Sequence, residues 1–328
     1  MKYRFLCAAA ALSTLAACGG GGTSVGLTPV VSGTTPTPSP STPTQTPSTV
    51  SYQTFAALTG NQNFRTACAS YLLAGVPPVA NPATAFGNGL ALSYTAATDA
   101  YAISGDGLSL SFGPSDVDAA VLAPAKGYIK VDAGFTQRFI IGRPAPAAAT
   151  LDYVRTIFLA TQRGAGPTNY QCVFGVPTLT TDVPSMSSVA FTKVGLSGAS
   201  SSYRLDTTTS PASLTTYSLE NSTATLSVDL TTGAVRSVIH LLGTVRSAAG
   251  AGATNVELGT YTGTGTINTT TGSYSGQFTD ASGNSLFAYF GGWFFGPQGR
   301  EAGFAFNIVK QDANGSQTSA VGTVTAQQ

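Results

Sequence analysis

Alternation of polar residues with small or apolar residues is clearest in the C-terminal half of the chain. From residue 260 to residue 267 every even position is a threonine, and the odd positions hold Tyr261, Gly263, Gly265 and Ile267. Because successive side chains of a strand point to opposite faces, this pattern predicts a β-strand with one threonine face. The other face is mostly small, so inside a narrow barrel it would leave room for large side chains from other strands.

Further strands are predicted throughout the chain, separated by turns rich in Gly, Asn, Asp and Pro. In the C-terminal half they span residues 224–229, 234–242, 273–278, 286–295, 303–310 and 320–325. In the upstream half they span residues 108–112, 128–131, 135–141, 151–160 and 170–176. Sequential strands with short turns favour an antiparallel meander that closes as a barrel in the C-terminal half.

One short helix is predicted upstream of these strands. Phe64, Cys68 and Leu72 repeat at four-residue spacing, with Asn61 or Asn63 as the N-cap and residues 75–78, Gly-Val-Pro-Pro, as the end. The predicted fold class is therefore mainly β, with a β-rich N-terminal part that contains one short helix.

The predicted strand 286–295 is apolar on both faces. Phe290 and Phe294 point one way, while Phe287, Tyr289, Trp293 and Phe295 point the other way. A strand buried on both sides needs a core on one face and a second layer on the other, which predicts a seam with the upstream domain. The alternative is that one face is an exposed aromatic patch for a ligand.

The N-terminus has the pattern of an export signal. Lys2 and Arg4 precede an apolar run, residues 5–15, that is too short for a permanent membrane span. Residues 15–18, Leu-Ala-Ala-Cys, resemble the lipobox of bacterial lipoproteins, in which the cysteine is acylated after residues 1–17 are removed. The resemblance implies a palmitate-type anchor on Cys18 and, because Gly19 follows, the outer membrane; the alternative is an ordinary signal peptide with an incidental cysteine.

The segment after Cys18 has the composition of a tether. Glycines at 19–22 and a Pro/Thr/Ser-rich stretch up to residue 49 leave nothing to bury, so residues 18–49 are predicted to be disordered. With Cys7 in the signal and Cys18 lipidated, Cys68 and Cys172 remain as a pair. Export to an oxidising compartment favours a disulfide between them over two free thiols.

Composition and motifs argue against several classes of function. Charged residues are 9% of the chain and the formal net charge is +1, so no electrostatic footprint for nucleic acid is present. His240 is the only histidine, and we interpret it as a strand-surface residue rather than a haem ligand. Residues 312–315 open like a calcium loop but lack its closing glutamate, so they are read as a turn. Asp116 and Asp118 are the carboxylates that a glycosidase-type hydrolase would use, on proximity alone. We expect no catalytic residues, no metal site and no cofactor.

Residues 292–304, Gly-Trp-Phe-Phe-Gly-Pro-Gln-Gly-Arg-Glu-Ala-Gly-Phe, resemble the barrel signature of transferrin-binding protein B and its relatives. That signature has a glycine, an aromatic pair, Gly-Pro, a short loop, Glu and a closing glycine, here Gly292, Phe295, Gly296, Pro297, Glu301 and Gly303. Gly296-Pro297 would end a strand, Gly303 would let the returning strand approach closely, and Glu301 would accept hydrogen bonds in the corner. Gly299 and Ala302 depart from the usual Ala and Gly, and the chain has length for one lobe only.

The resemblance implies a handle-like domain over residues 50–182 and an eight-stranded barrel over residues 183–328. It also implies a surface lipoprotein that binds a protein or a solute through barrel or handle loops, with iron or haem acquisition as one context and an outer-membrane receptor or export factor as a further partner. A structural or adhesive envelope lipoprotein without a dedicated ligand is the alternative, and a hydrolase is the second alternative. The sequence assigns no ligand-binding residue.

Overall fold

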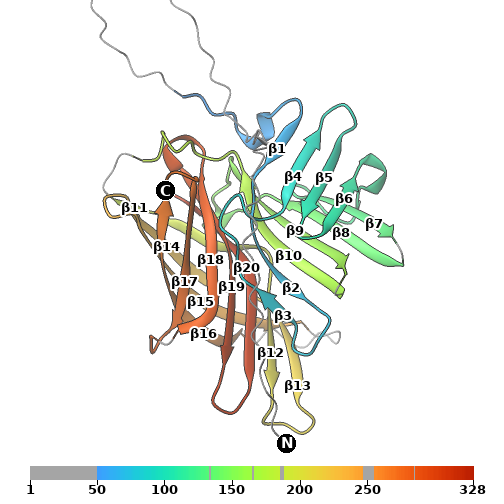
Figure 1. Cartoon of the computed structure of the whole chain (residues 1–328), viewed down its shortest axis with the longest axis vertical. Coiled ribbons are helices and arrows are strands. Elements are labelled where there is room, and N and C mark those ends of the chain that lie inside the picture. Colours follow the sequence, from blue (N-terminus) through green and yellow to red (C-terminus); the bar gives the residue numbers. More distant parts are fainter. Residues whose placement is uncertain (1–49, 133, 165, 185–187, 247–254, 284) are drawn as a thin grey trace, which may run out of the picture.

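The computed structural model describes residues 50–328, apart from residues 133, 165, 185–187, 247–254 and 284. The predicted signal peptide, Cys18 and the tether lie outside the described residues. Two β-rich parts lie side by side (Figure 1), which confirms the mainly β fold class. In the part of the chain that the structure describes, no helix has the length and apolar character needed to span a bilayer.

The first part, which we call the N-terminal sandwich, consists of two antiparallel sheets. One sheet has the order β1 (Gln62–Phe64), β4 (Ala91–Thr95), β5 (Ala100–Gly105), β6 (Leu108–Phe112). The other has the order β3 (Val79–Asn81), β2 (Ala67–Leu72), β10 (Gly166–Gly175), β9 (Val154–Arg163), β8 (Phe135–Gly142), β7 (Lys126–Asp132). Buried aromatic and aliphatic side chains of both sheets form one core between them, among them Ile103, Phe112, Phe139 and Leu159.

The second part is a barrel. Its ring of eight strands follows the order β15 (Ala234–Val245), β13 (Ser213–Ser218), β12 (Lys193–Asp206), β20 (Gln317–Gln327), β19 (Glu301–Gln311), β18 (Ser285–Phe295), β17 (Ser273–Asp280), β16 (Asn255–Asn268). Pairing of β16 with β15 closes the ring. In addition to these eight strands, β14 (Thr223–Asp229) pairs with the start of β15, and β11 (Ser188–Ala190) pairs with β14; their buried side chains join the core of the barrel. Short 3-10 helices occur at Phe55–Ala57, Pro114–Asp116, Pro146–Ala148 and Pro297–Gly299.

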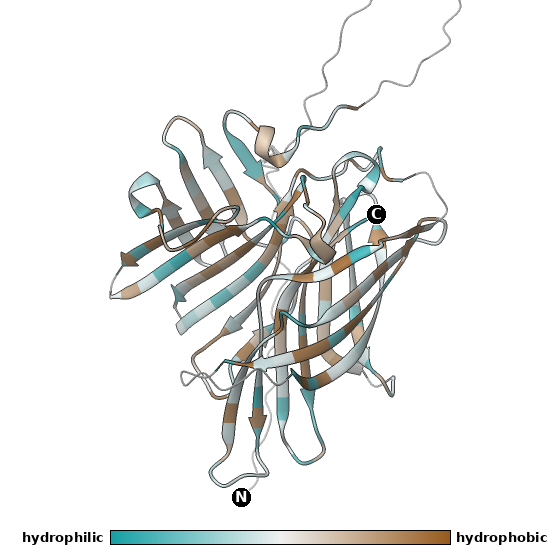
Figure 2. Cartoon of the chain, turned by 180° about the vertical axis from the view of Figure 1, so that it is seen from behind, coloured by the Kyte–Doolittle hydropathy of each residue, from teal (hydrophilic) through white to brown (hydrophobic). Residues whose placement is uncertain are grey.

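The threonine strand behaves as its pattern predicts. Within β16 the threonines are exposed and the alternate residues face the barrel interior. A side chain at Gly263 would lie 2.7 Å from the ring of Phe278, and one at Gly265 would lie 2.8 Å from the ring of Phe290. The small inner face therefore accommodates aromatic rings from β17 and β18. Figure 2 shows the same alternation of apolar and polar residues along strands of both parts.

The predicted short helix is wrong: its residues form β1 and the central strand β2. A spacing of four residues places side chains on one face of a helix, but it also places them on one face of a strand, because four is a multiple of two. Residues 67–71 are all buried, since one face of β2 carries Cys68 in the core of the sandwich and the other carries Ala69 and Tyr71 against the barrel. Burial on both faces removed the alternation that would have identified a strand.

The seam between the two parts lies mainly on β19 and β20 rather than on β18. The outward-facing residues of these two strands are buried beneath β2, β9 and β10, and Ala69 and Tyr71 of β2 pack with Ala305 and Val321. Asn307 supplies a polar anchor, because its Oδ1 accepts a hydrogen bond from Ala83 N at 2.8 Å and its Nδ2 donates to Phe287 O at 3.1 Å. Small side chains on β19 and β20 let the sheets approach closely.

Candidate functional site

The aromatic strand β18 contributes only its second half to the seam. Trp293 is 1% exposed and its Nε1 donates to Thr178 O at 2.8 Å, while the ring of Phe295 packs edge-on against Phe86. Phe290 and Phe294 are buried inside the barrel, as predicted. Phe287 is 45% exposed, so the expectation of burial along the whole outer face is wrong at that residue. The N-terminal sandwich covers the outer face of β18 at Trp293 and Phe295 but does not reach Phe287.

The fluorescence of Trp293 is a direct test of this half of the seam. Because the indole is enclosed and hydrogen-bonded to a backbone carbonyl, we expect blue emission that is protected from acrylamide in the native protein and becomes red and quenchable on unfolding. Trp293 is the only tryptophan, so the signal needs no assignment. Native emission that is red and freely quenched would mean that the outer face of β18 is an exposed aromatic strip.

The residues that resemble the barrel signature gather where β18 turns into β19. Gly296 has φ +74°, and a side chain there would lie 2.5 Å from the ring of Tyr153. Its carbonyl accepts a hydrogen bond from Thr178 Oγ1 at 2.6 Å. At Gly303 a side chain would lie 3.1 Å from Val154 Cγ2, so the returning strand packs closely on β9. These positions form a close-packed corner and not a ligand cavity.

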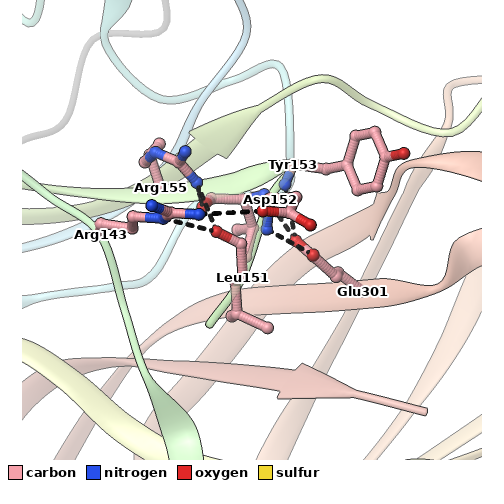
Figure 3. A network of polar contacts seen from close by, with 7 residues as sticks. Arg143, Leu151, Asp152, Tyr153, Arg155 and Glu301 are labelled. Carbon is pink, nitrogen blue, oxygen red and sulfur yellow. Dashed lines mark hydrogen bonds and ion pairs between the residues drawn. The ribbon is translucent and has the colours of Figure 1, made fainter. Parts of the chain in front are cut away.

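Glu301 joins this corner to the N-terminal sandwich. Its fully buried carboxylate accepts hydrogen bonds from three consecutive backbone N–H groups: Asp152 N at 2.6 Å, Tyr153 N at 2.9 Å and Val154 N at 2.8 Å (Figure 3). The expectation that Glu301 accepts hydrogen bonds in the corner is confirmed. Burial raises the pKa of the Glu301 carboxyl above its ordinary value, and the three N–H groups, which lower it, offset part of that rise.

The predicted disulfide is present. Cys68 on β2 and Cys172 on β10 face each other in the register of the two strands and are bonded. Beside it lies a cavity of about 390 Å³, at the place where residues 81–90 cross from one sheet of the sandwich to the other. Hydroxyl and amide groups of Ser70, Asn81 and Thr84 line it together with apolar side chains. A mixed lining and a volume in this range are typical of small-molecule sites.

A polar cluster stands at the rim of this cavity. Asp106 pairs with Arg163 at 2.5 Å and accepts a hydrogen bond from Tyr170 Oη at 2.7 Å. Burial and the bond to Asp106 raise the pKa of Tyr170, so its phenol remains a donor at neutral pH. Sequence analysis missed these three residues. Asp106-Gly107 is a hairpin-turn signal that could have placed Asp106 at a strand end, but no local signal connects it to β9 and β10.

The other residues weighed for chemistry are engaged elsewhere. Nε2 of His240 lies 2.5 Å from Glu257 on the outer wall of the barrel, with its side chain 38% exposed. Asp116 accepts a hydrogen bond from Gly113 N, and Asp118 pairs with Arg138 at 3.0 Å. Residues 312–315 form a turn closed by a bond from Gly315 N to Asp312 O. Among the described residues no group of three or more His, Cys, Asp or Glu side chains is placed to hold a metal ion.

Neither a protein-family model nor a curated protein sequence matches this chain. Solved structures that it resembles include a double mutant of transferrin-binding protein B from Haemophilus parasuis, with 12% identity over 80% of this chain and 45% of that one and a TM-score of 0.44. Transferrin-binding protein B from Neisseria meningitidis is 17% identical over 80% of this chain and 44% of that one, with a TM-score of 0.39. The haemoglobin receptor HpuA from Kingella denitrificans is 12% identical over 79% of this chain and 86% of that one, with a TM-score of 0.33. The chain thus matches less than half the length of each transferrin-binding protein B.

Proposed function

We propose that this chain is an exported lipoprotein that binds a ligand and catalyses no reaction. In this proposal residues 1–17 are the signal peptide, Cys18 carries lipid in the outer membrane, and residues 18–49 are a tether. The handle-like domain, residues 50–182, and the barrel, residues 183–328, are held at the cell surface. The observation that carries the binding function is the cavity of about 390 Å³ in the N-terminal sandwich, with the Asp106–Arg163–Tyr170 cluster at its rim.

The binding function is tested by blocking that cavity. Asn88 is exposed and lines both this cavity and one of about 620 Å³ that Arg65 and Thr271 also line, so Asn88→Trp should obstruct access to this region without disturbing the core. We expect native mass spectrometry of the exported full-length protein to show a co-purified small molecule that is lost in Asn88→Trp. Ala97→Trp, on an exposed turn away from the cavity lining, is the matched control and should retain the molecule.

A protein ligand is the other outcome that this proposal allows. Solved structures that this chain resembles include proteins named for binding transferrin and haemoglobin, and the N-lobe of lactoferrin binding protein B from Moraxella bovis. The immobilised full-length chain is therefore exposed to transferrin, lactoferrin and haemoglobin. Saturable binding that Asn88→Trp weakens at least about tenfold supports the same cavity region as the binding surface. A wild-type protein that carries no small molecule and captures none of the three proteins would favour the structural or adhesive alternative.

The lipid anchor is tested separately. Because the Leu-Ala-Ala-Cys tetrad at 15–18 places the acylated residue at Cys18, Cys18→Ser is expected to abolish membrane association and to leave the chain without the mass of the attached lipid. Cys7→Ser, within the predicted signal peptide, should have no effect on either property. Membrane association that survives in Cys18→Ser would refute the anchor.

A further inference from the structure

Another cavity, of about 220 Å³, lies on the N-terminal sandwich, and no residue that lines it lines the 390 Å³ cavity. Its apolar wall is formed by Phe55, Tyr101, Pro124 and Ile141. Three cationic side chains, those of Lys126, Arg143 and Arg155, also line the cavity. Two of them lie over its aromatic rings, Arg155 over Phe55 and Lys126 over Tyr101.

Arg155 is the least expected of the three cations, because it is only 5% exposed. Its Nη1 donates to Leu151 O at 3.0 Å and to Val154 O at 2.7 Å, and its guanidinium lies 4.7 Å from the ring centre of Phe55. No carboxylate of the described residues lies within ion-pair distance of it. Burying a charge without a paired charge is costly.

Arg143 converges on the same carbonyl oxygen. Its Nε donates to Leu151 O at 3.1 Å and its Nη2 pairs with Asp152 at 2.9 Å, so two guanidinium groups share one acceptor (Figure 3). Burial, and then the nearby Arg143, lower the pKa of Arg155 to about 10, which leaves it charged at neutral pH. The negative charges of Glu301 and Asp152 raise the pKa of Arg155 and offset part of this effect.

Lys126 has one carboxylate partner, and its ammonium also lies over the rings of Tyr101 and Tyr128, at 5.9 and 5.4 Å from their centres. Its Nζ lies 3.4 Å from Asp99, a half-exposed pair that is screened by solvent. The cavity is thus lined by three cations of which two have a carboxylate partner. A purely structural role for Arg155, tying Leu151 to Val154, accounts for its Nη1 but not for the two other cations around the same space.

We propose that this cavity binds a small organic anion, a carboxylate carried on a flat apolar body. The carboxylate accepts hydrogen bonds from the guanidinium groups of Arg143 and Arg155, which are suited to bidentate pairing with a carboxylate. The body of the ligand lies against Phe55, Tyr101 and Ile141. The volume is smaller than that of most drug-sized sites, so it fits an aromatic acid or one acidic end of a larger ligand.

The test is calorimetric titration of the purified full-length protein with benzoate, benzamide, acetate and inorganic phosphate. Benzoate is expected to bind with one-to-one stoichiometry. Benzamide has the apolar body without the charge, and acetate has the charge without the body, so both should bind at least about tenfold more weakly. Phosphate should also be weaker than benzoate, because it makes no use of the apolar wall.

Three variants locate the site. Arg155→Met and Arg143→Gln should each weaken benzoate binding by about tenfold to a hundredfold, as expected for loss of a charged hydrogen bond. Arg138→Gln is the matched control: Arg138 is 42% exposed and paired with Asp118 at 3.0 Å, as Arg143 is 33% exposed and paired with Asp152, but it lines neither this cavity nor the 390 Å³ cavity. It should leave benzoate binding unchanged.

If Arg155→Met does not fold, Arg143→Gln and Lys126→Gln decide the matter, because both residues are partly exposed. No measurable benzoate binding by the wild type, or binding that Arg143→Gln leaves unchanged, would overturn the site. Phosphate or acetate binding as tightly as benzoate would overturn the ligand class. This proposal is independent of any ligand of the 390 Å³ cavity, because Asn88 does not line the 220 Å³ cavity and Asn88→Trp should leave benzoate binding unchanged.

Discussion

Replacing both disulfide cysteines, Cys68→Ala with Cys172→Ala, is expected to lower the free energy of unfolding by about 4–5 kcal/mol. The bond closes a loop with a sequence separation of 104 residues, and a cross-link of that span restricts the unfolded chain strongly in the chain-entropy model. Cys68 and Cys172 also lie in the core of the sandwich, so the native state keeps their packing in the alanine variant only in part. Urea unfolding followed by Trp293 emission measures the change.

The control uses the same cross-link without mutation. Wild-type protein unfolded in excess reductant should lose stability by nearly the same amount as the double alanine variant, and reductant should not affect that variant. If the double variant unfolds within about 1 kcal/mol of the oxidised wild type, the bond contributes little, and the strands β2 and β10 hold together through their ladder and core alone.

The sequence identified strands where polar and apolar residues alternate, and it missed those made of small polar residues. β18 was predicted almost over its whole length because of its aromatic content, and threonine alternation identified residues 260–267 of β16 (Asn255–Asn268). β12 was missed, since it is rich in Ser and Gly and has few apolar side chains. Its Ser202 is nevertheless fully buried and donates to Ser319 O at 2.8 Å. A strand whose buried side chains are polar and hydrogen-bonded has no hydrophobic alternation in its sequence, so the sequence does not predict it.

The same property explains why the seam was assigned to the wrong strand. The outward face of β20 carries Thr323 and Thr325, both fully buried, and Thr323 Oγ1 donates to Ser197 O at 2.7 Å. The hydropathy of the sequence therefore predicted the seam at β18, which has the aromatic residues, although the N-terminal sandwich covers only the second half of that strand. The corner residues were found because their signature is local in sequence.

The cavities could not be predicted for a different reason. Arg143 and Arg155 come together through one carbonyl of the loop between β8 and β9, and neither belongs to a charge cluster in the sequence. Asp106 meets Arg163 and Tyr170 across two sheets, at a separation in sequence that no local pattern encodes. Sites assembled by long-range strand pairing depend on the register of the sheets, which the chain's pattern left open.

Replacing Glu301 by alanine is expected to lower the free energy of unfolding by about 3–5 kcal/mol, because three backbone N–H groups at a buried seam would lose their acceptor. Glu301→Gln retains one carbonyl acceptor and should cost less. Glu257→Gln is the control: Glu257 is 58% exposed on the outer wall, where it pairs with His240 and accepts one hydrogen bond from Gly259 N, so this change should alter stability by about 0.5 kcal/mol at most.

Glu301 also holds the loop that positions the two arginines of the anion cavity. The N–H groups of Asp152 to Val154 bind its carboxylate, while the Leu151 carbonyl immediately before them accepts from Arg143 and Arg155 (Figure 3). Glu301→Gln, if it remains folded, should therefore weaken benzoate binding although it lies outside that cavity's lining. Urea unfolding and benzoate titration of the same sample measure both effects. Unchanged stability in Glu301→Ala would show that the three hydrogen bonds do not join the barrel to the sandwich. If Glu301→Gln loses stability but binds benzoate with unchanged affinity, the loop keeps its shape without the carboxylate.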